Sequence, residues 1–325
     1  MNLMIKEYNI EKSPLFEMKN RRKLAILLKL PENYFRTIHK YKYYKFYKTK
    51  EDGSSREINN PECDLKKIQK QLFKLLNRVK KPEWVISGTK GKSYVDNAKV
   101  HYCNDYICTM DIEKFYDSTK EIYVYNFFKN TLKNSTDIAT ILANLVTYQG
   151  KIPTGTPTSQ LIAFWSYKST FEKIYEICKV ENIKFSLYVD DITLSSNMII
   201  NKKIKDKVNF LLNLKELNVK KKKTKFYSKN TNKAVTGAII DKNNNIRLEN
   251  KKRIEIINLY RKCSNPKTCS IEDLVKLNGK MSDAKQVENG IFTSISDFLK
   301  NRKSEINKYN INKVNKKLEG KKKNR

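Results

Sequence analysis

Two adjacent aspartates, Asp190 and Asp191, lie between two short apolar segments at residues 185–189 and 192–195. Apolar runs on either side of such a break predict two strands joined by a tight turn. Neighbouring carboxylates at a turn repel each other and are costly to desolvate unless a cation neutralises them. The pair therefore predicts a cation-binding hairpin or, in a plainer interpretation, an ordinary Asp-rich turn.

A third carboxylate favours the cation-binding interpretation. Residues 106–110 form another apolar run that predicts a strand, and Asp111 follows it directly. If the two strand ends are neighbours, the three carboxylates offer the oxygen ligands that magnesium prefers. Two such ions can activate a hydroxyl and neutralise a leaving phosphate. Phosphoryl transfer needs this positioning and neutralisation more than covalent help from protein groups.

The composition agrees with carboxylate chemistry on an anionic partner. The 325 residues include two histidines, His39 and His101, which leaves little room for histidine-based acid–base catalysis. Lys and Arg number 67 against 34 Asp and Glu, a formal net charge of +33. Such an excess is typical of proteins that bind nucleic-acid phosphates. Codon bias of an AT-rich genome also favours lysine, and we expect both causes to apply.

Other classes of site and location are disfavoured. Six cysteines contain no C-x-x-C pair, so we expect no zinc site. No apolar run approaches the roughly 20 residues that span a bilayer. Residues 1–30 carry acidic side chains and lack the layout of a signal peptide. We therefore expect a cytoplasmic protein with no membrane partner.

The remaining pattern predicts an α+β chain. Helical spacing of apolar residues is found at 15–30, 65–79, 121–132, 138–148, 158–180, 204–217 and from 249 onward. Strands are expected at 41–49, 56–59, near 226 and at 235–240, with Asp52-Gly53 as a hairpin turn. Residues 300–325 hold eleven Lys and Arg against two Glu, as a basic helix on nucleic acid or as a solvated tail.

Four segments, in the right order, resemble motifs of reverse transcriptases. Residues 110–116 (MDIEKFY) are similar to motif A, and residues 188–191 (YVDD) to motif C. Between them, residues 152–159 (IPTGTPTS) resemble motif B. Residues 56–61 (REINNP) are similar to the R-x-I-x-x-P motif of the fingers.

Two shorter segments resemble the retron branch of that family. Residues 97–101 (NAKVH) match its N-A-x-x-H ahead of motif A, and residues 235–237 (VTG) match its V-T-G after motif D. The chain is also expected to end with the thumb, without the DNA-binding and endonuclease extensions of many group II intron proteins.

The retron resemblance implies a reaction and its partners. The reaction would be RNA-directed DNA synthesis from dNTPs on a cognate structured non-coding RNA. Priming from the 2′-OH of a guanosine in that RNA would give branched, RNA-linked msDNA. The cofactors would be two Mg²⁺ ions, and an effector protein would be the partner in antiphage defence.

The resemblance also implies a right-hand polymerase fold with fingers, a palm and a helical thumb. The fingers would take residues 1–104, with 119–153 returning to them. The palm would take residues 105–240, and the thumb with its basic C-terminal end residues 241–325.

Roles follow residue by residue from the same resemblance. The metal ligands would be the carboxylates of Asp111, Asp190 and Asp191. The backbone carbonyl of Ile112 would be a fourth ligand. Arg56 resembles the fingers residue that holds the incoming triphosphate, a task suited to a bidentate guanidinium. Lys50 in the same hairpin and Gly155 of motif B would also contact the nucleotide.

Further roles each have a structural alternative. Tyr116 occupies the position of the aromatic gate that crowds a ribose 2′-OH, or it packs in the core. Lys223 resembles the motif D lysine proposed to protonate pyrophosphate, or the run at 220–223 is a solvated face.

The retron signatures are expected to contact RNA or primer. Asn97 and His101, four residues apart, would share one helix face and help to recognise the structured RNA. A satisfied structural histidine is the alternative. Val235, Thr236 and Gly237 would lie beside the primer strand, or pack as a plain strand.

The chain departs from the family pattern at several positions. Thr154 stands where many reverse transcriptases carry Gln, and Thr156 and Gln160 stand where Ala and a second Pro are common. Val189 replaces the Ala usual in retron motif C. None of these changes removes a carboxylate, so we expect activity.

Two other functions remain open at this point. One is a different bacterial reverse transcriptase, of the group II intron or diversity-generating type. The other is an RNA-binding component with a vestigial polymerase site, against which the three intact aspartates argue.

Overall fold

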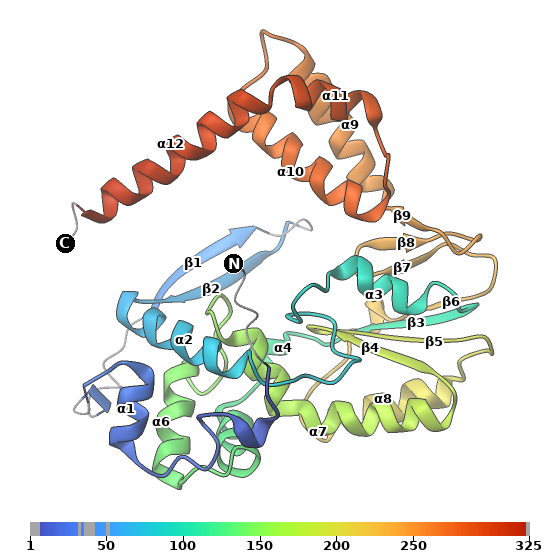
Figure 1. The fold of residues 1–325 in the computed structure, drawn as a ribbon. Helices are drawn as coiled ribbons and strands as arrows, with labels where there is room; N and C mark the ends of the chain where they lie inside the picture. The colour runs from blue at the N-terminus through green and yellow to red at the C-terminus, as the bar shows by residue number, and fades with distance from the viewer. Residues whose placement is uncertain (1–6, 32–33, 36–42, 50–52, 323–325) are drawn as a thin grey trace. The chain divides into compact units, whose positions relative to one another are not determined.

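The chain falls into two compact units. The computed structural model describes residues 7–31, 34–35, 43–49 and 53–322 (Figure 1). Unit 1 comprises residues 1–92 and 104–226, and unit 2 comprises residues 93–103 and 227–325. Each unit has its own cluster of buried apolar side chains.

The central element of unit 1 is a four-stranded sheet in the order β4-β5-β3-β6. Its strands are β3 (Tyr106–Asp111), β4 (Lys184–Tyr188), β5 (Asp191–Ser196) and β6 (Lys225–Tyr227). Strand β5 runs antiparallel to both β3 and β4. Most side chains of β4 and β5 are buried, among them the polar Ser186, Thr193 and Ser195.

Helices cover the sheet and complete the core of unit 1. Helix α7 (Ser159–Val180) and helix α8 (Lys202–Asn213) lie together below β4 and β5 in Figure 1. The short helix α4 (Phe115–Ser118) follows β3 and contacts α7. This layered arrangement buries the apolar side of the sheet. The β4–β5 connection lies at one end of the strands.

A two-stranded sheet forms the other part of unit 1. Strand β1 (Tyr43–Thr49) pairs antiparallel with β2 (Ser55–Pro61), as predicted. Helix α2 (Cys63–Leu76), α5 (Glu121–Asn126) with the π-helical turn at Phe127–Thr131, and α6 (Thr136–Val146) pack nearby. Only Gly53 of the predicted Asp52-Gly53 turn lies within the described residues.

One predicted helix is shorter than its pattern suggested. Helix α1 spans Arg21–Leu28 and not 15–30. Glu17 has a positive φ of 52°, which interrupts a helix, and Asn20 caps the helix by accepting a hydrogen bond from the Lys23 N–H at 3.0 Å. The apolar residues before Asn20 therefore pack in a turn.

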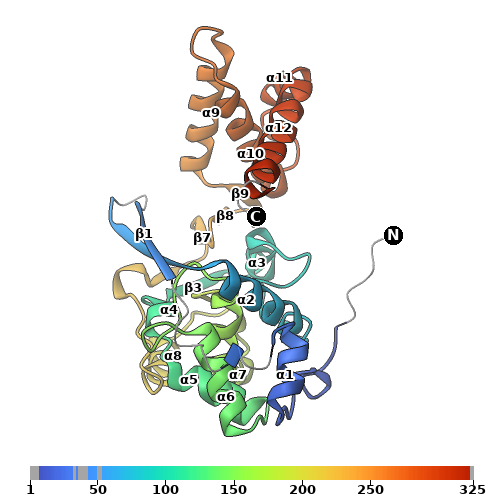
Figure 2. The same ribbon diagram turned by 90° about the vertical axis from the view of Figure 1, so that its left-hand side faces the viewer.

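Unit 2 combines one short helix, a small sheet and a helical end. Helix α3 (Tyr94–His101) contacts strand β8 of the antiparallel sheet β7 (Lys233–Val235), β8 (Ala238–Ile240) and β9 (Ile246–Leu248). Helices α9 (Asn250–Ser264), α10 (Ile271–Val287), α11 (Thr293–Asn301) and α12 (Lys303–Lys322) follow. Figure 2 shows them from a second direction.

The prediction of one strand over 235–240 was wrong. Residues 235–240 turn back on themselves between β7 and β8, with Val235 opposite Ala238. Thr236 and Gly237 both have positive φ, 47° and 90°, which matches a two-residue type I′ hairpin turn.

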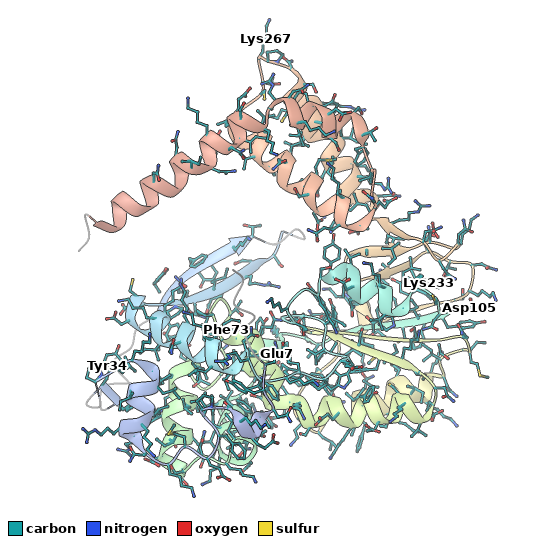
Figure 3. The ribbon with its side chains drawn as sticks, in the orientation of Figure 1. Glu7, Tyr34, Phe73, Asp105, Lys233 and Lys267 are labelled. Atoms are coloured by element: carbon teal, nitrogen blue, oxygen red, sulfur yellow. The ribbon has the colours of Figure 1, made fainter. Side chains whose placement is uncertain are left out.

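Helices of unit 2 pack on one another through a shared cluster of buried apolar side chains. Leu277 and Met281, one turn apart on α10, are buried against Ile256 of α9 and Ile295 of α11 within one cluster. Lys233 on β7, labelled in Figure 3, is charged yet 2% exposed. None of the helices in the described part of the chain is long and apolar enough to cross a membrane.

Candidate active site

The β4–β5 turn consists of Val189 and Asp190 alone, because Tyr188 pairs with Asp191. Val189 has a φ of 60°, whereas Asp190 has no positive φ, which is the pattern of a type II′ turn. Glycine usually takes the first position of that turn, and a β-branched residue there is strained. Strain of this kind persists only where surrounding contacts hold it.

Strand pairing brings the third aspartate to this turn. Asp111 at the end of β3 is the Cα partner of Asp191 at the start of β5. The Ile112 N–H donates a hydrogen bond to the Asp190 carbonyl at 2.9 Å. The predicted adjacency of the two strand ends is therefore present in the structure.

Burial and neighbouring charges raise the pKa of Asp190 and of Asp191. Burial, followed by the charges of Asp190 and Asp111, raises the pKa of Asp191 from 3.8 to about 7. Burial and then the charge of Asp111 raise the pKa of Asp190 as well. A partly buried site that disfavours negative charge to this degree is suited to binding a cation.

Asp111 has two lysine partners. The segment 218–220 runs beside residues 111–113, with the Lys220 N–H donating to the Asp111 carbonyl at 2.9 Å. This pairing allows the side chains of Lys220 and Lys223 to form ion pairs with Asp111, the latter at 2.9 Å. The hydrogen bond to Asp111 is the main reason that the pKa of Lys223 is raised.

Lys223 was a predicted site residue, whereas Lys220 was not predicted as a partner of Asp111. Only the position of Lys220 within the lysine run at 220–223 could have pointed to it. Within the described ranges, no group of three or more His, Cys, Asp or Glu side chains is arranged to hold a metal ion.

The donor chemistry nevertheless fits a hard divalent cation. Asp190 and Asp191 are adjacent carboxylates whose like charges repel each other, and the pKa of each is raised. Carboxylate oxygens are the ligands that magnesium takes, and binding would require both groups to lose their protons. Asp111 would exchange its ammonium partners for the cation.

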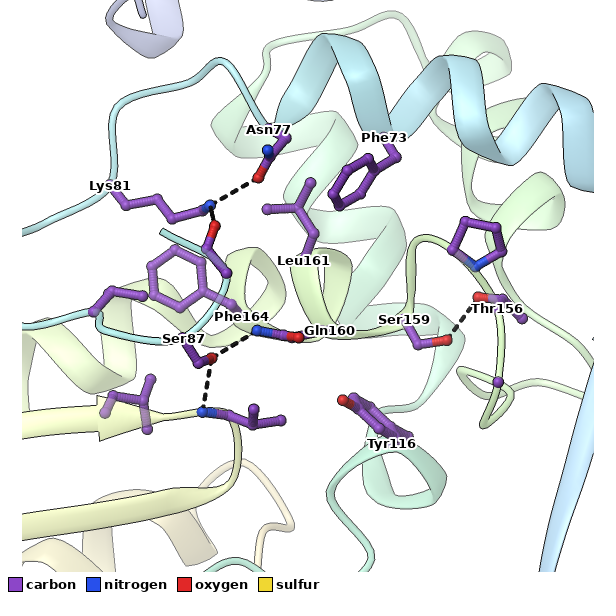
Figure 4. A pocket seen from close by; sticks show the side chains of 16 residues that line it. Phe73, Asn77, Lys81, Ser87, Tyr116, Thr156, Ser159, Gln160, Leu161 and Phe164 are labelled. Atoms are coloured by element: carbon purple, nitrogen blue, oxygen red, sulfur yellow. Dashed lines mark hydrogen bonds between the residues drawn. The ribbon is translucent and has the colours of Figure 1, made fainter. Parts of the chain in front are cut away.

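A cavity of about 400 Å³ lies beside the β4–β5 hairpin (Figure 4). It is lined by both polar and apolar side chains, among them Phe73 of α2, Ser87, Tyr116, Gln160, Phe164 and Val189. Tyr116, the predicted gate, lines this cavity together with Val189 of the turn. Burial, and then the charge of Asp190, raises its pKa to about 12, so the phenol stays protonated.

The motif B loop is attached to the β1–β2 hairpin. The Asn59 N–H donates to the Thr154 carbonyl at 2.9 Å. Gly155 has a φ of 104°, and a Cβ built on it would lie 2.5 Å from Cγ2 of Ile58. Glycine is therefore required at this position by both backbone conformation and close packing.

Arg56 and Lys50 are the two cationic side chains predicted to bind the triphosphate. Arg56 is exposed on β2, and its charge acts on Tyr116 against the rise of that pKa. Lys50 lies outside the described residues.

The retron-like signatures meet inside unit 2. Asn97 and His101 of α3 are both fully buried. The Asn97 Nδ2 donates to Thr236 Oγ1 at 3.2 Å, and that hydroxyl donates to the Tyr94 carbonyl at 3.2 Å. The two short motifs thus bind each other, which the sequence alone did not indicate.

Comparison with known proteins agrees with the motif resemblance. A family model described as "Reverse transcriptase (RNA-dependent DNA polymerase)" matches residues 48–240. Retron Se72 reverse transcriptase of Salmonella heidelberg is 32% identical over 168 residues, 51% of this chain and 44% of the relative. The chain therefore spans less than half the length of that relative.

Two further relatives come from Escherichia coli. Retron Ec83 reverse transcriptase is 26% identical over 76% of this chain and 83% of its own length. Retron Ec86 reverse transcriptase is 25% identical over 62% of this chain and 63% of its own length. Apo telomerase from Candida tropicalis has 13% identity, a TM-score of 0.46, and coverage of 64% of this chain and 55% of its own.

Proposed function

We propose that this chain, which belongs to the reverse transcriptase family of RNA-dependent DNA polymerases, copies RNA into DNA at the β4–β5 turn. The observation that carries the proposal is the pairing of Asp111 with Asp191, next to Asp190 at the tip of the turn. Two neighbouring carboxylates with raised pKa values beside a third are of little structural use and suit charge-neutralising phosphoryl transfer.

Asp111, Asp190 and Asp191 would hold two Mg²⁺ ions, with the Ile112 carbonyl as a further ligand. Bound there, the ions supply activation of the primer hydroxyl and neutralisation of the triphosphate. The chain's own residues bind and orient the substrates. Arg56 would hold the triphosphate of the incoming dNTP through its planar guanidinium.

Lys223 and Tyr116 would act at opposite ends of the nucleotide. The Lys223 ammonium, which pairs with Asp111, would donate a proton to the departing pyrophosphate. The Tyr116 ring, placed at the cavity beside the turn, would exclude a ribose 2′-OH. Gly155 would keep motif B close to the β1–β2 hairpin so that the nucleotide site is complete.

We propose further that the enzyme is of the retron type. The three curated relatives are named retron reverse transcriptases, and the chain carries NAKVH and VTG at the matching places. Its template would be a cognate structured non-coding RNA, primed from a guanosine 2′-OH to give branched RNA-linked msDNA. An effector protein would complete an antiphage defence system in the cytoplasm.

The division into fingers (1–104 with 119–153), palm (105–240) and thumb (241–325) remains part of this proposal. It differs from the two compact units, whose boundaries lie at 92–93, 103–104 and 226–227. The difference arises because the palm of the proposal includes the β7–β8 hairpin, which packs with α3 in unit 2.

The decisive experiment expresses the gene with its flanking non-coding DNA and separates total nucleic acid on a denaturing gel. We expect a discrete small DNA that shortens with RNase and with debranching enzyme. It should vanish in Asp190→Asn/Asp191→Asn and persist in Asp206→Asn, whose exposed carboxylate lies on α8.

Purified protein on a generic primed RNA template separates the remaining outcomes. Magnesium-dependent extension without the small DNA would mean a reverse transcriptase of another type. No extension and no small DNA would leave an RNA-binding protein and would refute the polymerase proposal.

A further inference from the structure

One serine hydroxyl connects three parts of unit 1 at the candidate active site. Ser87 follows the segment 84–86, which runs beside β4. Its Oγ accepts a hydrogen bond from the Val189 N–H at 3.0 Å and another from Gln160 Nε2 at 2.6 Å. Figure 4 shows both bonds. The segment, the β4–β5 turn and the first turn of α7 therefore meet at one oxygen atom.

The segment that carries Ser87 is itself fixed to the sheet. The Leu187 N–H donates to the Trp84 carbonyl at 2.9 Å, and the Ile86 N–H donates to the Leu187 carbonyl at 3.0 Å. These two bonds extend the sheet by a short parallel bridge along β4. Ser87, 8% exposed, continues this line past the end of β4 and reaches the turn with its side chain.

The Val189 amide needs such a partner. Val189 holds a positive φ of 60°, which costs free energy for a β-branched residue and requires contacts that impose it. An amide at a partly buried turn that lost its acceptor would be destabilised by about 1–3 kcal/mol. The next residue in the chain is Asp190, so the orientation of this peptide directly affects where that carboxylate lies.

Gln160 completes the arrangement from the other side. It is the residue that stands where the motif B pattern commonly has proline, which has no side-chain donor. The fit around it is close, because a Cβ on Gly88 would lie 2.9 Å from Gln160 Nε2. Lys81 Nζ donates to the Gly88 carbonyl at 2.5 Å and to Asn77 Oδ1 at 2.9 Å. These bonds hold Gly88, the residue after Ser87, in place.

We propose that Ser87 is a positioning residue for the catalytic turn and that Gln160 fixes its hydroxyl, so that together they orient the Val189–Asp190 peptide. The proposal rests on the proposed polymerase function for its kinetic consequence. The hydrogen bonds of Ser87 with Val189 and Gln160 do not depend on the polymerase function. Neither residue is expected to touch the reacting atoms.

The test compares Ser87→Ala, Ser87→Thr, Gln160→Leu and, as a matched control, Ser166→Ala. The Ser166 hydroxyl donates to the Ile162 carbonyl within α7, so its loss removes one local hydrogen bond and leaves the turn intact. Single-nucleotide incorporation on a primed RNA template gives kcat and KM for the dNTP. Amide hydrogen exchange of the peptide covering residues 185–192 reports on the turn.

In Ser87→Ala we expect kcat to fall about tenfold and KM to change less than about threefold, because misplacement of the carboxylate affects the chemical step. Exchange at the turn should become about tenfold faster, the factor that about 1.4 kcal/mol produces. Ser87→Thr, which keeps the hydroxyl and has the cavity for its methyl group, should recover both.

Gln160→Leu should have a smaller effect of the same kind, and the double variant with Ser87→Ala should be no worse than Ser87→Ala alone. A kcat within about twofold of wild type in Ser87→Ala would overturn the proposal, as would a Ser87→Thr variant as slow as Ser87→Ala. If the wild type incorporates no nucleotide, the polymerase proposal fails. Unchanged exchange in Ser87→Ala would then separately refute the contact.

Discussion

Asp191 stands directly across the β3–β5 ladder from Asp111, although the two belong to segments far apart in the chain. Antiparallel pairing places directly opposite side chains close together, and like charges in that position are normally destabilising. The pairing is therefore retained at a cost to stability.

Asp191→Asn should stabilise the protein freed of metal by chelator, by about 1–3 kcal/mol at pH 8. The pKa of Asp191 is raised to about 7 from 3.8, so the folded state keeps a proton that the unfolded state has lost. Stability is therefore lost as pH rises from about 4 to about 7, and the gain from Asn should be smaller at pH 5 than at pH 8.

Urea unfolding at both pH values measures this difference, with Asp206→Asn as the control for an exposed carboxylate. An equal gain at pH 5 and pH 8 would show that the Asp191 pKa is not raised.

Lys223→Ala should lower kcat by about tenfold or more while KM for the dNTP changes little. Its side chain is 61% exposed, and its ammonium, 2.9 Å from Asp111, is free to leave that carboxylate for a phosphate oxygen. Lys222→Ala removes the neighbouring positive charge and serves as the control. Equal slowing by both variants would indicate a general charge effect of the lysine run.

Tyr116→Ala should raise incorporation of ribonucleotides relative to deoxyribonucleotides by about tenfold or more. Without the ring, the space beside the β4–β5 turn can take a ribose 2′-OH. Tyr116→Phe keeps the ring and should keep the discrimination. Competition between labelled rNTP and dNTP on one template measures the ratio. An unchanged ratio in Tyr116→Ala would leave the ring with a packing role only.

Gly155→Ala should destabilise the protein by about 2–4 kcal/mol, since the new Cβ adds a clash with Ile58 to an unfavourable φ. Combining it with Ile58→Ala removes the clashing Cγ2 and should recover part of the loss relative to Ile58→Ala alone. Gly91→Ala, with a φ of 77° and no atom within 4 Å of its Cβ, should cost only about 1 kcal/mol. Thermal unfolding compares the three.

Asn97→Ala should destabilise the chain by about 1–3 kcal/mol, because the buried amide donates to Thr236. Lys99→Ala, on the exposed face of the same helix, should change stability by less than about 0.5 kcal/mol. RNA binding is measured in parallel. Weaker binding at unchanged stability in Asn97→Ala would favour the predicted direct contact with RNA over the internal one.

The sequence by itself determined the local elements and the chemistry of the site. Short apolar runs predicted β3, β4 and β5, and their ends fell at Asp111 and on either side of Asp190 as expected. These features depend on residues close together in the chain, so periodicity and residue type carry them. The motif order likewise pointed to the family that the comparisons later confirmed.

Only the tertiary structure decided which side chains meet. The partnership of Lys220 with Asp111, the bond from the Val189 amide to Ser87, and the bond between Asn97 and Thr236 each join distant segments. The register of strand pairing and the packing of helices on the sheet create these contacts, and neither is encoded by the neighbours of any one residue. The positive φ of Val189 belongs with them, because local preference opposes it and only its surroundings hold it in place.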